Sequence, residues 1–230
     1  MGANAVTTVP VYTAGEVLTA ANLNITNSGI PVFATTTTRD AAFGGTGEKT
    51  LAEGQFAYIE ATNTTQYYDG AAWLGLGGKL GQVVSTTKTD TYTMSSTTYA
   101  TVTGLTATIT PSSSSSKVLI VASLSANGEP GISRSTSRII RDSTAISVPA
   151  AAGSRVVGTS PITLSGSAEI FSSILTFLDS PASTSALVYG VQVRCNDAAA
   201  STYVNRSPSD ADNASFQRVT STITVMEILA

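Results

Sequence analysis

The chain has 230 residues, which is enough for one medium-sized domain or two small ones. Only 12% of the residues are charged, where soluble proteins average roughly 25%, and serine and threonine supply the polarity instead. The formal net charge is −3, and the basic residues are scattered apart from Arg134, Arg138 and Arg141, so there is no basic stripe of the kind that follows a nucleic-acid backbone. Threonine is β-branched and suits a half-exposed strand, so this composition predicts a mostly β protein.

Residues 1–35 are predicted to form an extended anchoring arm. Val9-Pro10-Val11 and Ile30-Pro31-Val32-Phe33 favour extended backbone, because proline disfavours the helical region for the residue before it. An extended apolar segment that cannot bury itself is expected to lie on a neighbouring protein. The apolar side chains that we expect to make this attachment are Val9, Val11, Tyr12, Leu18, Leu23, Ile30, Val32 and Phe33.

Residues 36–78 are predicted to form a small β-hairpin module. Thr38–Phe43 favours one helical turn, and Gln55–Glu60 alternates like a strand. Gln66–Leu74 predicts a hairpin, with Asp69-Gly70 in a type I′ turn and Trp73 at an aromatic centre. A module of about 40 residues is small for independent stability, so we expect support from oligomerisation.

Residues 79–230 are predicted to form a β-sandwich or jelly-roll-like domain, after a glycine-rich linker at Gly75–Gly81. The expected strands are short and are separated by Gly, Pro, Asn, Asp and Ser, as in sandwich folds. They are Leu105–Thr110, Lys117–Leu124, Ser137–Arg141, Glu169–Leu178, Leu187–Arg194 and Thr222–Leu229.

The absence of histidine removes most catalytic arrangements. Ser-His-Asp and Cys-His sites are excluded, and the commonest zinc ligand is missing. Cys195 is the single cysteine, so an internal disulfide is impossible, and its position after the apolar Val191–Arg194 segment predicts a small strand residue. We therefore expect no catalytic residue, no bound cofactor and no metal site.

Carboxylate chemistry is the remaining enzymatic alternative, as in a polysaccharide depolymerase. The isolated acids occur in no recognisable motif, and Glu227 is interpreted as a rim or interface residue. These acids are Glu129, Glu169, Asp179 and Glu227.

Two polar patterns have both a simple and a functional interpretation. Gly44–Thr50 resembles a phosphate loop, but Glu48 separates its glycine from its lysine, so we interpret it as a turn. The group Asp197, Asp210, Asp212 and Asn213 is a solvated loop or, alternatively, a calcium site.

The start, Met1–Ala5, lacks the basic and apolar regions of a signal peptide, and no segment has the roughly 20 apolar residues needed to cross a membrane as a helix. The longest apolar run is Val118–Ala122, which has the length of a strand. We expect no membrane insertion and no nucleic-acid partner.

Several segments resemble known bacteriophage proteins. Val32–Phe43, Leu51–Tyr58 and Gln66–Trp73 resemble a small module in tail-fibre and other virion proteins of tailed phages. The second half resembles the C-terminal domains of phage fibre-like proteins, often from marine or cyanobacterial phages. Its matching segments are Gly81–Val84, Val102–Pro111, Phe177–Pro181, Tyr203–Ser207 and Ser221–Ile228.

The resemblance implies a homotrimeric virion component, made in the host cytoplasm and carried on the extracellular particle. We expect a tail-fibre or head-fibre type of structural protein, a fibre, spike or knob, attached to other virion proteins through its arm and projecting its C-terminal domain outward. One alternative is a host-attachment adhesin that binds a surface glycan or protein, with Tyr203 and Arg206 as contacts. A second alternative is a capsid-decoration protein, because the resemblance does not distinguish tail from capsid.

Overall fold

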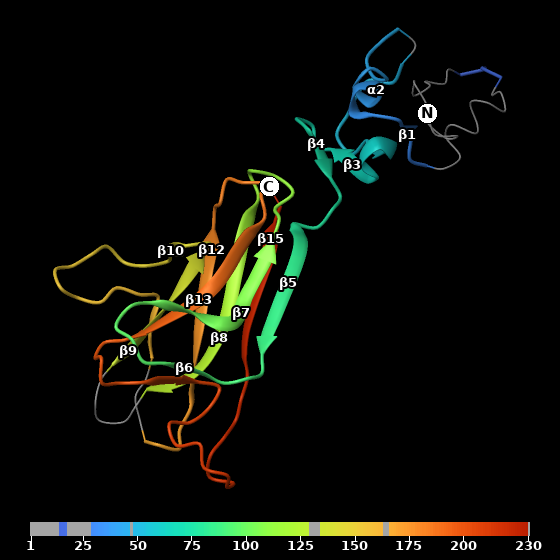
Figure 1. Ribbon diagram of the computed structural model, residues 1–230. Helices are drawn as coiled ribbons and strands as arrows, with labels where there is room; N and C mark the ends of the chain where they lie inside the picture. Colours follow the sequence, from blue (N-terminus) through green and yellow to red (C-terminus); the bar gives the residue numbers. More distant parts are fainter. Residues whose placement is uncertain (1–13, 18–28, 47, 129–133, 163–165, 230) are drawn as a thin grey trace. The chain divides into compact units, whose positions relative to one another are not determined.

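The computed structural model describes residues 14–17, 29–46, 48–128, 134–162 and 166–229. The chain divides into two compact units, Met1–Gly78 and Lys79–Ala230. The prediction of a mostly β protein is confirmed. In the described ranges the helical elements are α2 (Thr36–Asp40) and the 3₁₀ turn η1 (Glu60–Thr62), and the other elements are strands (Figure 1).

The first unit contains a four-stranded sheet in the order β1-β2-β3-β4. Its strands are β1 (Val32–Phe33), β2 (Phe56–Ile59), β3 (Thr64–Tyr68) and β4 (Trp73–Gly75). Strand β1 pairs with β2 in parallel, whereas the other pairs are antiparallel. The sheet therefore begins at Val32, a residue that the sequence had placed in the arm.

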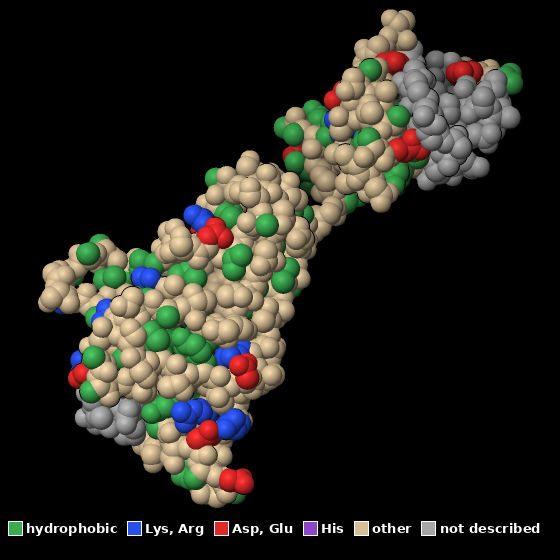
Figure 2. All heavy atoms as spheres, in the orientation of Figure 1, with side chains coloured by type: hydrophobic (Ala, Val, Ile, Leu, Met, Phe, Trp, Pro, Cys, Tyr) green, Lys and Arg blue, Asp and Glu red, His purple; other side chains and the backbone are tan. Residues whose placement is uncertain are grey.

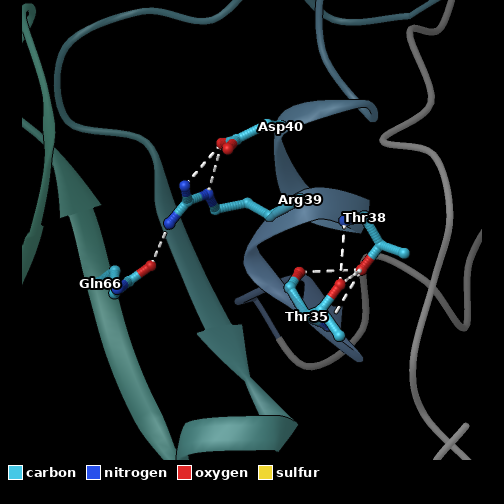
Figure 3. A network of polar contacts seen from close by, with 5 residues as sticks. All are labelled: Thr35, Thr38, Arg39, Asp40 and Gln66. Carbon is cyan, nitrogen blue, oxygen red and sulfur yellow. Dashed lines mark hydrogen bonds and ion pairs between the residues drawn. The ribbon is translucent and has the colours of Figure 1, made fainter.

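Helix α2 is positioned by its N-terminal cap. Thr35 and Thr38 form a capping box, in which the Thr38 N–H donates to Thr35 Oγ1 at 3.2 Å and the Thr35 N–H donates to Thr38 Oγ1 at 3.0 Å (Figure 3). The helix therefore starts earlier than the turn that was predicted from Thr38. Arg39 is buried, forms an ion pair with Asp40 at 2.6 Å and donates to Gln66 of β3.

Aromatic side chains complete this small core. Phe33, Ala42, Ala57 and Ile59 are fully buried, and Phe43 and Trp73 pack against them. The Arg39 guanidinium carbon lies 4.6 Å from the centroid of the Trp73 ring, which is a cation–π contact. Trp73 is thus part of an aromatic centre, as expected.

The predicted type I′ turn at Asp69-Gly70 is wrong. Tyr68 pairs with Trp73, so the loop contains four residues, Asp69–Ala72. The Asp69 carboxylate accepts the N–H groups of Ala71 and Ala72 at 2.9 and 2.7 Å, and these bonds lower the pKa of Asp69. Within the loop only Gly70 has a positive φ, of 97°, whereas a type I′ turn requires two.

The second unit consists of two antiparallel sheets. The six-stranded sheet has the order β5-β15-β8-β14-β6. Strands β15 and β14 pair with successive parts of one edge of β8, and β12 pairs with its opposite edge. Its strands are β5 (Leu80–Lys88), β6 (Tyr92–Met94), β8 (Lys117–Gly128), β12 (Phe171–Asp179), β14 (Thr202–Val204) and β15 (Ser221–Ile228).

The five-stranded sheet has the order β10-β9-β13-β7, and β11 also pairs with β9. Its strands are β7 (Ala100–Ile109), β9 (Ser135–Arg141), β10 (Thr144–Ile146), β11 (Ser160–Ile162) and β13 (Leu187–Cys195). The long strands alternate between the two sheets along the chain, as in a jelly roll. The edge strands β5 and β7 contact each other, so the sheets curl together on that side.

The core of this unit lies between the two sheets. Leu105 and Val191 from one sheet, and Ile120, Leu124 and Ile223 from the other, are fully buried. Burial of such side chains contributes about 1.5–3 kcal/mol each relative to exposure, so this layer is the main source of stability.

A polar link also joins the sheets. The Asp179 Oδ2 atom of β12 accepts hydrogen bonds from Arg141 Nη1 of β9 and from the Tyr189 hydroxyl of β13, both at 2.7 Å. Burial and the bond to Asp179 raise the pKa of Tyr189. Asp179 is thus a structural residue of the fold.

The interpretation of Glu227 as a rim or interface residue is wrong, because its side chain is only 1% exposed. Its Oε1 atom accepts the Ser112 N–H and the Ser112 hydroxyl, both at 2.6 Å. Burial raises the pKa of Glu227, but the bonds from Ser112 outweigh this effect and the net pKa lies below its usual value. The fold therefore favours the charged carboxylate.

Glu227→Gln should destabilise the second unit at neutral pH by roughly 1.5–3 kcal/mol, because bonds to a charged acceptor are lost. A lowered pKa in the folded state gives stability that is present above the unfolded-state pKa and disappears as the pH falls through the folded-state value. The wild-type advantage should therefore be constant near neutral pH and shrink as the pH falls below the unfolded-state pKa of 4.5. Denaturant unfolding of both proteins at several pH values measures this difference in the free energy of unfolding. A difference that does not change with pH would contradict the role of Glu227 as a charged acceptor.

Candidate interaction surface

Strand β12 carries apolar side chains on both faces. Leu175 is 1% exposed and points into the core, whereas Ile174 and Leu178 are 64% and 47% exposed. Successive residues of a strand point to opposite faces, so two adjacent apolar residues cannot both be buried by one neighbouring layer. Ile174 and Leu178 therefore lie on the side of the six-stranded sheet that faces away from the core.

These exposed side chains belong to a row that crosses four strands. Leu178 is paired with Leu119 of β8, Leu119 with Met226 of β15, and Met226 with Val83 of β5. Directly paired residues of antiparallel strands lie side by side on one face. Val83 is 52% exposed, and Leu119 and Met226 are half-buried. We call these four residues the apolar row.

Two further rows on the same face carry hydroxyl and aliphatic side chains without a charge. Ser85 and Thr224 of neighbouring strands share a hydrogen bond of 2.9 Å between their hydroxyl oxygens. We call the three rows together the outer face. Besides the apolar row, it comprises Thr176, Val121, Thr224, Ser85, Ile174, Ser123, Thr222 and Thr87.

The outer face has the chemistry of an interaction surface. Adjoining exposed apolar side chains, such as those of the apolar row, are a feature of interaction sites. Its uncharged hydroxyl groups can be buried at a lower desolvation cost than charged groups. Figure 2 shows one side of this unit, on which Lys, Arg, Asp and Glu side chains form separate groups between larger areas without charge.

The attachment residues expected in the arm are only partly within the described chain. Ile30 and Val32 are half-buried, and Phe33 is fully buried in the core of the small module. Phe33 therefore packs within its own unit. The others lie outside the described residues: Val9, Val11, Tyr12, Leu18 and Leu23.

The structure brings the two expected receptor contacts together. The Arg206 guanidinium carbon lies 4.2 Å from the centroid of the Tyr203 ring. Arg206 also donates to the carbonyl oxygens of Ser207 and Pro208 and to the Thr93 hydroxyl. The arginine is thus engaged within the chain and covers the tyrosine ring.

The expected acidic loop is not gathered into one cluster. Asp210 forms an ion pair with Arg218 at 2.6 Å, and Asp197 accepts the N–H of Ala199. Among the described residues, no three acidic, cysteine or histidine side chains are grouped so that they could hold a metal ion. No described helix has the length and the apolar character needed to cross a membrane.

No protein-family model and no curated protein matches the chain.

The outer face was not predicted from the sequence. Its signal is the pairs of adjacent apolar residues, Ile174-Leu175 and Phe177-Leu178, which place apolar groups on both sides of β12.

Cys195 is a buried strand residue, as the sequence indicated. Its side chain is fully buried, and its sulfur lies 3.2 Å from the Met94 carbonyl oxygen. A thiol without access to solvent cannot react with an external reagent unless the structure opens.

The native protein should therefore react negligibly with a thiol reagent such as a dithiobisnitrobenzoate, and the denatured protein should release one equivalent of chromophore per chain. The absorbance of the released chromophore, measured with and without denaturant, gives the number of reactive thiols per chain in each state. Rapid and complete reaction of the native protein would show that β13 and β6 do not cover the sulfur.

Proposed function

We propose that the protein is a structural component of a bacteriophage particle, a fibre, spike or knob, and that it assembles as a homotrimer through the outer face. The apolar row, Leu178–Leu119–Met226–Val83, is the observation that carries the self-association. The virion location and the number of subunits rest on the resemblance of the sequence segments to phage fibre proteins.

A second copy of the chain is a suitable partner for the outer face. Interfaces in homo-oligomers are more apolar than the rest of the surface, and symmetric assembly brings equivalent patches of several copies together. Charged groups at a contact would have to give up their hydration, which costs free energy. The three rows of the outer face carry no charge, so a contact between copies there avoids this cost.

The contacts of the buried acids support a structural and non-enzymatic role. Asp179 binds Arg141 and Tyr189 between the sheets, and Glu227 binds Ser112 at the edge of the core. Both carboxylates thus serve packing. The adhesin alternative at Tyr203 has less support, because Arg206 covers the ring. Capsid decoration belongs to the same structural class and differs only in position on the particle.

The double variant Ile174→Lys/Leu178→Lys should abolish the trimer and leave a folded monomer, because it places two positive charges in the outer face. Both wild-type side chains are at least 47% exposed, so the fold of the single chain should tolerate the change. Light scattering after gel filtration should show that the molar mass falls from three times 23.4 kDa to 23.4 kDa. Circular dichroism checks that the variant is folded.

Val188→Lys is the matched control. Val188 is also an exposed aliphatic residue of a long strand, 38% exposed, but it belongs to the five-stranded sheet. This variant should remain trimeric. A wild-type monomer at micromolar concentration, or equal dissociation of both variants, would contradict assembly through the outer face.

Attachment through the N-terminal arm predicts that a chain without residues 1–30 folds and forms trimers but is absent from phage particles. An antibody to the chain, imaged on particles by electron microscopy, should label the particle with the full chain and not with the truncated one. Labelling also distinguishes tail from capsid. Normal incorporation of the truncated chain would contradict the role of the arm, and absence of the full chain from particles would contradict the virion proposal.

A further inference from the structure

The five-stranded sheet presents two arginines on its solvent side. Arg138 of β9 is paired with Gln192 of β13, and Arg194 of β13 is paired with Thr136 of β9. The two arginines are therefore diagonal neighbours on one face. Their guanidinium carbons lie 3.9 and 5.7 Å from the centroid of the same ring, that of Tyr99.

In the described part of the chain, neither guanidinium forms an ion pair with a carboxylate. The ion pairs there are formed by Arg39, Lys88, Arg141 and Arg218. Arg138 donates through Nε to Gln192 Oε1 at 2.8 Å, and Arg194 donates through Nε to the Cys195 carbonyl oxygen at 3.2 Å. Within the same described residues, the terminal amino groups of both arginines have no acceptor. Both side chains are only half-buried, so a ligand can reach them.

This arrangement costs free energy unless something compensates for it, because two like charges lie on neighbouring positions of one face. The Tyr99 ring compensates in part through its negative faces. Its position is fixed, since the Tyr99 hydroxyl donates to the Val157 carbonyl oxygen at 2.6 Å. A negatively charged ligand would remove the remaining repulsion.

The neighbouring side chains favour a saccharide as the ligand. Gln192 and Thr136 on the strands, and Thr101 within 3.3 Å of the Gln192 amide nitrogen, are neutral hydrogen-bonding groups suited to sugar hydroxyls. A nucleic acid is less suitable, because a series of phosphates needs more than two cations. Guanidinium groups bind carboxylates in a planar, bidentate manner.

We propose that Arg138 and Arg194, held on Tyr99, form a binding site for a carboxylate-bearing saccharide, such as a polymer of uronic acid. The carboxylate accepts hydrogen bonds from the terminal amino groups of the two arginines, and the neutral side chains beside them contact the hydroxyls. The site lies on the opposite sheet from the outer face, and it does not depend on the oligomeric state proposed above.

Titration of the purified full chain with a galacturonate oligosaccharide, followed by calorimetry, tests this site. Binding should weaken as salt is added, and a neutral glucan of equal length should not bind. Arg138→Gln/Arg194→Gln should lower the affinity by at least about tenfold. Lys79→Gln/Arg218→Gln is the control with the same change in charge, made at two exposed positions, and it should bind like the wild type.

Light scattering and thermal unfolding show whether each variant keeps its molar mass and its fold. A loss of saccharide binding can therefore be distinguished from a loss of trimer assembly. If the double variant does not fold, Arg194→Gln alone makes the test, because Arg194 lies farther from the Tyr99 ring. Absence of galacturonate binding, equal binding of the neutral glucan, or an equal loss in the control would overturn the proposal. Tighter binding of a single-stranded oligonucleotide would also overturn it.

Discussion

The second unit depends on strand β8, whose two faces have different surroundings. It pairs with β12 on one side and with β14 and β15 on the other. Because side chains alternate along a strand, its apolar run must place Ile120 towards the core and Leu119 and Val121 away from it. The five-stranded sheet covers the first set. The second set forms the centre of the outer face, the surface through which we propose that copies of the chain associate.

The two sheets of this unit differ on their solvent sides although they share one core. The outer face of the six-stranded sheet carries hydroxyl and aliphatic groups, whereas the five-stranded sheet presents Arg138 and Arg194. The proposed assembly surface and the proposed saccharide site therefore lie on different sheets. The buried Asp179 carboxylate contributes to the geometry that holds the sheets together, since it accepts hydrogen bonds from Arg141 and Tyr189 of the opposite sheet.

Much of the strand content could be predicted from the sequence, because Leu187–Arg194 and Thr222–Leu229 have strongly apolar or alternating patterns. Strand β5 is a contrasting case. Leu80 and Gly81 were expected in a glycine-rich linker, but they belong to β5 because that strand pairs with β15. The prediction of a type I′ turn was wrong for a similar reason, since the pairing of Tyr68 with Trp73 sets the length of the loop. Pairing involves distant residues, and local patterns do not contain it.

The sequence by itself determined that the protein is mostly β. A chain rich in hydroxyl and β-branched residues favours strands. Only the tertiary structure decided which side chains meet. Glu227 became a buried acceptor, Leu178 joined a row with Met226, and Arg194 came to lie beside Arg138. The physical reason is that strand register, which is set by packing across the whole unit, assigns each side chain its face and its neighbours.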